Sequence, residues 1–202
     1  MTGAQRRQQL LDIGRELFGQ KGYEATSIEE IATRADVSKP VVYEHFGGKD
    51  GLYAAVVERE MRVVLDRFTS ALADPGRPRE LLERAALSLL AYIEEHTDGF
   101  RVLTRDAPVV SGVSTYSSLI GEVARKVEHI LGREFDSRGY DSRLAQLYSQ
   151  ALVGMVSLVG QWWLDNRSLD KERVAAHLVN LSYNGLSHLE PRPGLVDGPT
   201  GA

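Results

Sequence analysis

The chain has 202 residues, of which 43% are hydrophobic and 26% charged, a composition typical of a globular protein and not of a disordered one. It contains no cysteine, which excludes disulfides, thiol catalysis and cysteine zinc sites and suits a reducing, cytoplasmic location. The net charge of -4 argues against a protein that binds nucleic acid indiscriminately, because such a protein needs a strongly basic surface.

The first predicted helix follows a short flexible start and ends at about Gln20. Its buried face is formed by residues at helical spacing, namely Leu10, Leu11, Gly14, Leu17 and Phe18. Gly22 is expected to end this helix. Arg6 and Arg7 at its start are either solvated or available to a phosphate.

Residues 27–46 have the pattern of two short helices joined by a tight turn. Ser27 and Glu30 are spaced as a capping box at the start of the first helix. The buried face of that helix repeats at i, i+3, i+4 and i+7, with Ile28, Ile31, Ala32 and Ala35. Asp36 falls in the turn, Ser38 is expected to cap the second helix, and Pro40 suits its first turn.

Such a motif can insert its second helix into the major groove of DNA. Hydroxyl groups and helix N-termini can contact phosphates. Cationic side chains can contact phosphates or guanine edges, and apolar groups can contact thymine methyls. Nine residues are candidates for such contacts. They are Thr26, Ser27, Ser38, Lys39, Pro40, Val41, Tyr43, His45 and Lys49. Taken singly, each has an alternative interpretation as an ordinary surface residue; taken together at this spacing, they favour DNA contact.

Longer helices are expected after this motif, over residues 49–72, 79–96, 115–134, 143–166 and 170–189. Residues 73–78, ADPGRP, separate the first of these from the second. One short helix is expected before Pro108, a polar loop over 132–142, and a disordered tail after Pro191. The chain has no strand pattern, so an all-α fold is expected.

The last two helices are apolar on more than one face, which favours a homodimer built as a four-helix interface. The candidate interface residues are Val159, Trp162, Trp163, Leu178, Leu181 and Gly185. The alternative is a plain monomeric core. Dimerisation also suits DNA recognition, because two reading helices about 34–36 Å apart contact successive major grooves.

A set of residues in the first third of the chain resembles a known family pattern, namely Phe18, Gly22, Tyr23, Thr26, Ile31, Ala32, Val37, Ser38, Lys39, Tyr43, Phe46, Lys49 and Leu52. Over residues 7–72 the chain is similar to the N-terminal domain of the TetR family of bacterial transcriptional regulators. Asp36 departs from the family pattern, which usually has glycine there. We expect Asp36 to adopt a left-handed conformation at modest cost.

The resemblance implies an N-terminal three-helix helix-turn-helix DNA-binding domain, residues 1–48, joined by a long helix to a helical effector-binding and dimerisation domain, residues 49–190. Residues 191–202 would be a disordered tail. The implied partners are a near-palindromic double-stranded operator, a second copy of the chain, and a small apolar or amphipathic effector such as an acyl-CoA-like molecule. No cofactor or metal is expected. No membrane is expected either, because the longest apolar run, residues 151–164, is too short to span a bilayer.

Candidate residues for an effector pocket are Tyr92, Phe100, Leu103, Tyr116, Leu119, Val123, Tyr148, Leu152 and Met155. Each has an alternative interpretation as plain core. The five histidines lack metal-binding spacing and no catalytic motif is present, so no enzyme is expected. The favoured function is a repressor released by its effector. The alternatives are a ligand-dependent activator or co-repressor, and a helical lipid-like carrier or enzyme without DNA binding.

Overall fold

The computed structural model describes residues 1–105, 116–190 and 193–194, and this part of the chain is helical without strands. The all-α fold class is therefore confirmed. Its elements in chain order are α1 (Gly3–Lys21), α2 (Ile28–Arg34), α3 (Lys39–Phe46), α4 (Lys49–Ala71), α5 (Pro78–Glu95), α6 (Thr97–Thr104), α7 (Tyr116–Arg138), the short 3-10 helix η1 (Ser142–Leu144), α8 (Ala145–Asp165) and α9 (Lys171–Ser187).

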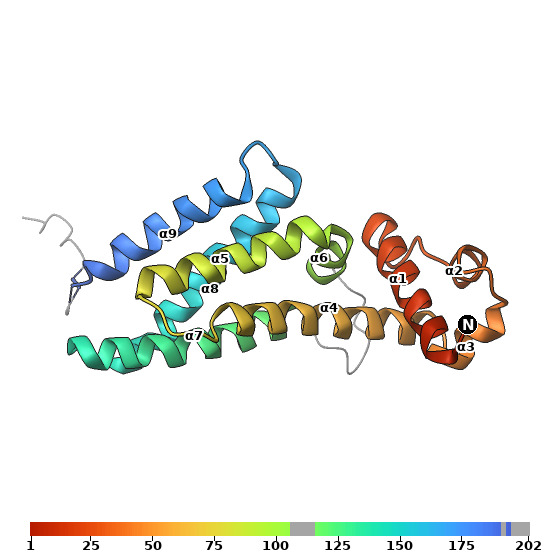
Figure 1. Cartoon of the computed structure of the whole chain (residues 1–202), viewed down its shortest axis with the longest axis horizontal. Coiled ribbons are helices and arrows are strands. Elements are labelled where there is room, and N and C mark those ends of the chain that lie inside the picture. The colour runs from red at the N-terminus through yellow and green to blue at the C-terminus, as the bar shows by residue number, and fades with distance from the viewer. Residues whose placement is uncertain (106–115, 191–192, 195–202) are drawn as a thin grey trace, which may run out of the picture.

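The molecule is elongated, with α1, α2 and α3 grouped at one end (Figure 1). The long helix α4 leaves this group and runs along the molecule. Helices α5 and α7 pack along its far part, α8 packs on α7 and α5, and α9 packs on α5. Helix α6 lies between α1 and the far bundle. This arrangement places α4 and α6 in contact with both ends of the molecule.

The start of α1 corrects one expectation from the sequence. The residues before Arg6 are helical from Gly3, because Thr2 and Gln5 form a reciprocal capping box. Only half of the capping box predicted for Ser27 and Glu30 forms: Ser27 accepts from the backbone N–H of Glu30, whereas the Glu30 carboxylate is paired with Lys21. Ser38 occupies the N-cap position of α3 but makes no side-chain capping hydrogen bond.

The polar loop predicted for residues 132–142 is wrong over most of its length. Helix α7 continues to Arg138, because Leu131 and Phe135 lie one turn apart and pack with Ala145 in a second hydrophobic cluster. Only residues beyond Gly139, which has a φ of 73°, form the connection to α8. Buried contacts here outweigh the polar composition of the segment.

Helix α6 packs unusually close to its neighbours through glycine. A Cβ placed on Gly99 would lie 2.3 Å from Glu60 Oε2, and one on Gly19 would lie 2.6 Å from the Cβ of Asp98. These two contacts join α6 to α4 and to α1. The short helix predicted before Pro108 corresponds to α6, while Pro108 itself and most of the predicted disordered tail lie outside the described residues.

Candidate functional sites

The turn between α2 and α3 is fixed by its backbone. Asp36 has a φ of 52°, the positive value expected for a residue that replaces glycine in a left-handed position. The N–H of Val37 donates to the Ala32 carbonyl at 3.0 Å, which closes the end of α2. The carbonyl of Ala35 accepts from Gln9 Nε2 and Arg6 Nη1, both at 3.2 Å. Arg6 therefore stabilises the turn from α1.

Helix α3 presents one buried face and one exposed face. Val42 is fully buried, and Phe46 is half-buried with the Arg7 guanidinium 4.9 Å from its ring centre. The opposite face carries an exposed Tyr43, whose side chain is 54% accessible. Among the predicted DNA contacts, exposed or half-buried positions are occupied by Ser27, Ser38, Lys39, Pro40, Val41, Tyr43, His45 and Lys49.

Lys39 is exposed, but its ammonium is paired with Glu29 of α2. This hydrogen bond is the main cause that lowers the pKa of the Glu29 carboxyl, with the charge of Lys39 adding to it. The pair is solvated on both sides, so exchange of Glu29 for a phosphate oxygen costs little. Before it contacts any polyanion, Lys39 is therefore already paired with the carboxylate of Glu29.

Two of the predicted contacts are used inside the protein. Thr26 is buried, and its hydroxyl donates to the Gly22 carbonyl at 2.8 Å, so the expectation of a phosphate contact from this side chain is wrong. Lys49 Nζ lies 4.2 Å from the ring centre of Tyr23 and donates to the Glu24 carbonyl at 3.3 Å. Its ammonium therefore holds the start of α4 against the loop before α2.

The same loop is held by Tyr23 itself. Its hydroxyl donates to Asp50 in the first turn of α4. Burial and the neighbouring Asp50 raise the pKa of Tyr23 to about 12, so the phenol stays protonated at neutral pH. The ring also contacts Phe18 and Tyr53, which ties α1, the loop and α4 together.

Glycines fix how α3 meets α4. Gly47 ends α3 with a φ of 72°, and Gly48 follows with a φ of 132°. Gly51 lies so close to the end of α3 that an added Cβ would be 1.8 Å from the Phe46 carbonyl oxygen. The junction is therefore a close backbone contact, and the sequence analysis did not single out Gly51.

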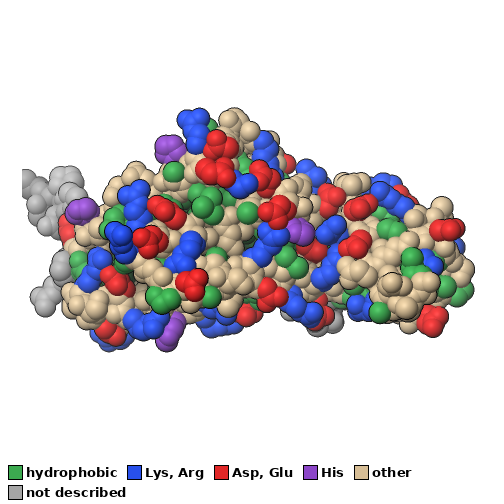
Figure 2. Space-filling view, viewed as in Figure 1, with side chains coloured by type: hydrophobic (Ala, Val, Ile, Leu, Met, Phe, Trp, Pro, Cys, Tyr) green, Lys and Arg blue, Asp and Glu red, His purple; other side chains and the backbone are tan. Residues whose placement is uncertain are grey.

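Charge at this end is balanced. Residues 1–70 contain 10 Lys and Arg against 11 Asp and Glu. Figure 2 shows both signs mixed over the α1–α3 end on the face in view. Any affinity for DNA must therefore come from a few positioned groups and not from a general basic surface.

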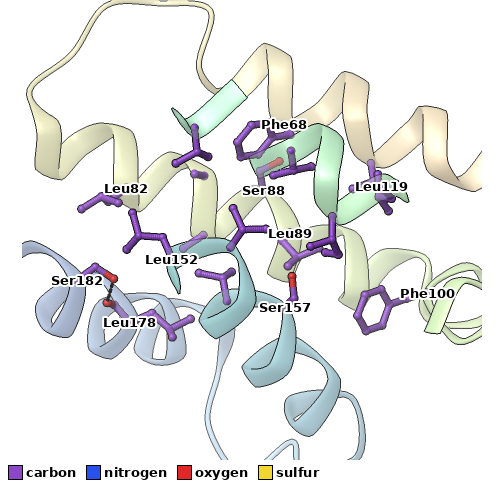
Figure 3. Close-up of a pocket in the computed structure, with 18 of the residues that line it drawn as sticks. Phe68, Leu82, Ser88, Leu89, Phe100, Leu119, Leu152, Ser157, Leu178 and Ser182 are labelled. Carbon is purple, nitrogen blue, oxygen red and sulfur yellow. Dashed lines mark hydrogen bonds between the residues drawn. The ribbon is translucent and has the colours of Figure 1, made fainter. Parts of the chain in front are cut away.

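A second candidate site is a cavity of about 100 Å³ inside the far bundle, called here the inner chamber (Figure 3). Six of the nine predicted pocket residues line it, namely Phe100, Leu103, Tyr116, Leu119, Val123 and Leu152. Side chains that the sequence analysis missed complete the wall, including Val64 and Phe68 of α4, Leu82 and Leu89 of α5, and Leu178 and Ser182 of α9. Their helical spacing alone could not distinguish them from core.

Three predicted pocket residues lie elsewhere. Tyr148 packs on Phe135 in the second cluster, with ring centres 5.4 Å apart. Met155 packs against the main core without lining the chamber. Tyr92 is fully buried and donates to Glu60 Oε2 at 2.9 Å, which makes it part of the junction between the two ends of the molecule.

That junction is a network around the buried carboxylate of Glu60, which is 1% accessible. Glu60 accepts from Tyr92 on one oxygen and from Arg59 on the other, and Arg59 Nη1 also donates to Asp12 of α1 at 2.8 Å. Burial, with Glu60 beside it, raises the pKa of Tyr92 and keeps it a donor. The network links α1, α4 and α5, and Gly99 of α6 packs directly on it.

Apolar side chains are exposed along α8 and α9. Leu147, Leu158 and Trp162 are 63%, 67% and 51% accessible, and Leu181 is 65% accessible. Of the predicted dimer residues, Trp162, Leu181 and Gly185 are exposed and Val159 is half-buried. Leu147 and Leu158 were missed, although they share a helical stripe with Trp162.

Two predicted interface residues are buried within the subunit. Trp163 is 1% accessible and its indole N–H donates to the Leu169 carbonyl at 2.8 Å. Leu178 is buried and lines the inner chamber. Trp163 therefore serves the core of its own subunit, and placing it in an interface was wrong. Leu178 also borders a surface groove with Val159, Trp162 and Leu181, so its place in an interface stays a prediction.

Within the described ranges, no group of three or more His, Cys, Asp or Glu residues is arranged to hold a metal ion. No helix in the described part of the chain combines the length and apolar character needed to cross a bilayer.

Comparisons with known proteins agree with this arrangement. A family model for bacterial regulatory proteins of the tetR family matches residues 10–56, and one for a tetracyclin repressor-like C-terminal domain matches residues 78–185. The HTH-type transcriptional activator FasR of Mycolicibacterium smegmatis is 32% identical over 190 residues, which cover 92% of this chain and 84% of that protein.

Solved structures give the same result. A TetR-like transcriptional regulator from Rhodococcus sp. RHA1 has a TM-score of 0.72 and 29% identity, covering 93% of this chain and 98% of that one. AibR, solved in complex with isovaleryl coenzyme A and operator DNA, has a TM-score of 0.71 at 19% identity, covering 87% and 97%. The second likeness is one of fold alone.

Proposed function

Because the chain belongs to the TetR family of bacterial transcriptional regulators, we propose that it binds operator DNA as a homodimer and that a small effector controls this binding. The observation that carries the proposal is the exposed face of α3, with Tyr43 and Lys39 directed away from a buried Val42. Family membership in transcriptional regulators disfavours the alternative of a carrier or an enzyme.

We assign residues 1–48 to DNA binding and residues 49–190 to effector binding and dimerisation. In the DNA-bound state, Lys39 exchanges Glu29 for a phosphate or a guanine edge, and Tyr43 donates to a phosphate. Ser38 and the unpaired N–H groups at the start of α3 suit a further phosphate, because the Ser38 side chain makes no cap.

The exposed stripe on α8 and α9 supports dimerisation. Leu147, Leu158 and Trp162 together with Leu181 form an apolar face that water contacts in the single subunit. Large exposed apolar patches mark interaction sites, and a twofold pairing of these two helices buries the stripe against itself. Such a dimer presents two copies of α3 to a near-palindromic operator.

The inner chamber supports an apolar or amphipathic effector. Those of its lining residues that the structure describes are apolar apart from hydroxyls, and none of these is charged. AibR, which shares the fold, was solved with isovaleryl coenzyme A, and this agrees with an acyl-CoA-like effector class for the present chain. The proposal names the class and leaves the individual compound to experiment.

Helix α6 is the proposed route between the two sites. Phe100 and Leu103 of α6 line the inner chamber, while Gly99 packs on Glu60 and Asp98 packs on Gly19 of α1. A ligand that moves Phe100 must therefore move α6 against α1 and α4, because these contacts leave no free space. A hundredfold difference in effector affinity between the two states would shift the equilibrium by about 2.7 kcal/mol.

The direction of control has two candidates. Release of a repressor is the first, and effector-dependent activation is favoured by the likeness to FasR, a transcriptional activator. Titration of acyl-CoA compounds into the protein bound to a fluorescent DNA fragment from upstream of its own gene separates them. Falling anisotropy supports release and rising affinity supports co-binding, whereas a fragment that never binds contradicts the proposed function.

A further inference from the structure

The inner chamber has a neighbouring cavity toward the distal end of the molecule. A second cavity of about 440 Å³, called here the outer chamber, lies beside it. Both cavities are lined by Phe68, Leu82, Ala85, Val127 and Leu152, so they adjoin along these side chains and are together called the channel. Helix α7 runs along the whole of it, with Tyr116 at the inner chamber and Arg133 at the outer one.

The inner chamber contains an enclosed hydroxyl group, that of Tyr116, whose hydrogen-bonding capacity is not used by well-placed partners among the described residues. Tyr116 Oη is shielded from solvent, and no residue in the described part of the chain forms a hydrogen bond of good geometry with it. Ser157 and Gln161 are its polar neighbours, and the Ser157 hydroxyl is directed into the cavity in Figure 3. A buried donor in this state gains from any molecule that supplies an acceptor.

The same chamber is unsuitable for an ion. Among the described residues that line it there is no Lys, Arg, His, Asp or Glu, so a carboxylate placed there would have no counter-charge from this part of the chain. Burial raises the pKa of Tyr116, which keeps this hydroxyl neutral as well. The group that meets Tyr116 must therefore be uncharged.

The outer chamber has the opposite character. Its wall includes Arg133, Glu134 and Arg138 at the distal end of α7. Arg138 is paired with Glu134 at 2.7 Å, whereas Arg133 forms no ion pair with any described residue. One cation at the mouth is thus available for an anionic group.

We propose that the effector is an elongated molecule bound in one orientation along α7. Its anionic head lies at Arg133, its apolar chain fills the channel, and an uncharged oxygen at its buried end forms a hydrogen bond with Tyr116. The distance along α7 between positions 116 and 133 is about 26 Å, which sets an upper limit on the length of the chain. This inference rests on the proposed function, since it specifies the ligand of the same effector site.

The buried end is tested with matched pairs of ligands. Calorimetric titration of the full-length protein uses saturated fatty acids of increasing chain length and the ω-hydroxy acids of the same lengths. At the optimal length the hydroxy acid should bind about fivefold more tightly than the plain acid, the contribution of one hydrogen bond. Tyr116→Phe should abolish this preference and leave the affinity for the plain acid unchanged, which also shows that the variant is folded.

The orientation is tested at the mouth. Arg133→Gln should lower the affinity for the fatty acid about tenfold and leave the affinity for the fatty alcohol of the same length unchanged. Arg125→Gln is the matched control, because Arg125 is exposed on the same helix and lines neither chamber. Equal binding of both members of a pair by the wild-type protein and by Tyr116→Phe, or equal effects of the two arginine variants, would overturn the inference.

Operator binding is measured in parallel on the same preparations. If the protein binds its operator and responds to acyl compounds, but without these pairwise preferences, the inference fails and the proposed function stands. If the ligands show the preferences and no DNA fragment is bound, the channel is assigned correctly and the regulatory function is wrong.

Discussion

The α2–α3 turn is formed by one short continuous segment of the chain, whereas the effector channel is formed by segments that are far apart in the sequence. The turn and its exposed face come from residues 27–46, one continuous stretch whose backbone is fixed by Asp36, Gly47 and Gly48. The channel takes its wall from α4, α5, α6, α7, α8 and α9, which are spread over more than half of the chain. Local backbone geometry therefore determines the first site, whereas cooperative packing of distant segments determines the second.

This difference has a consequence for mutation. A change at the turn should impair one site while the other remains intact, because the two sites lie at opposite ends of the molecule and the contacts between these ends run mainly through α4 and α6. A change at the junction should instead weaken communication between them. The predictions below test this separation.

The largest effect is expected from Gly51→Ala. The added Cβ would lie 1.8 Å from the Phe46 carbonyl, so α3 must shift on α4. We expect operator affinity to fall at least about a hundredfold, or about 2.7 kcal/mol. Ligand binding in the channel should persist. The control is Gly121→Ala in α7, where the new Cβ meets nothing within 4 Å.

Leu158→Glu should have the next largest effect. A carboxylate in the middle of the exposed stripe on α8 would be buried without a partner in the proposed dimer. Sedimentation should show a dimer dissociation constant raised at least about tenfold, with operator binding reduced and the channel unchanged. Ser70→Glu adds the same charge to an exposed position on α4 and should have no such effect.

Tyr92→Phe addresses the junction. It leaves one oxygen of the buried Glu60 carboxylate without its donor, which should lower the free energy of unfolding by about 1–2 kcal/mol. The change in operator affinity caused by a channel ligand should also become smaller. Tyr148→Phe is the matched control, because Tyr148 lies in the distal cluster. Identical denaturation curves and identical ligand responses for both variants would contradict the role of Tyr92.

The smallest effect is expected from Glu29→Gln. This change frees Lys39 from its partner, so operator affinity should rise about twofold to fivefold at low salt. The dependence of log affinity on log salt should also become steeper by about 1. Glu44→Gln on α3 removes the same charge without releasing a lysine, and a rise of equal size in that variant would refute the importance of the pair.

The sequence was sufficient to predict the geometry of the turn but not all the residues that line the channel, and the reason is physical. The positive φ of Asp36 follows from residues within one turn of the chain, and it was predicted correctly. Six of nine pocket residues were also found, yet Tyr92 was misplaced because its partner Glu60 lies on another helix. No local pattern records such a pairing.

The wrong predictions for Thr26 and Trp163 also arose because the sequence does not show which side chains are buried. From the sequence, Thr26 has the position of a free hydroxyl at a helix start, but its hydroxyl donates a hydrogen bond to the Gly22 carbonyl. Trp163 and Trp162 are adjacent and equally apolar, yet one is internal and the other exposed. The 3.6-residue period separates their directions by about 100°, and the orientation of α8 against its neighbours, which is a tertiary property, determines which of them faces solvent.

The double variant Lys39→Ala/Tyr43→Ala is the decisive test of whether the exposed face of α3 contacts DNA. Anisotropy with a fluorescent fragment from upstream of the protein's own gene should show affinity reduced at least about a hundredfold. The dimer and the thermal unfolding should be unchanged, because both side chains are exposed. Undiminished binding by the double variant would contradict the account.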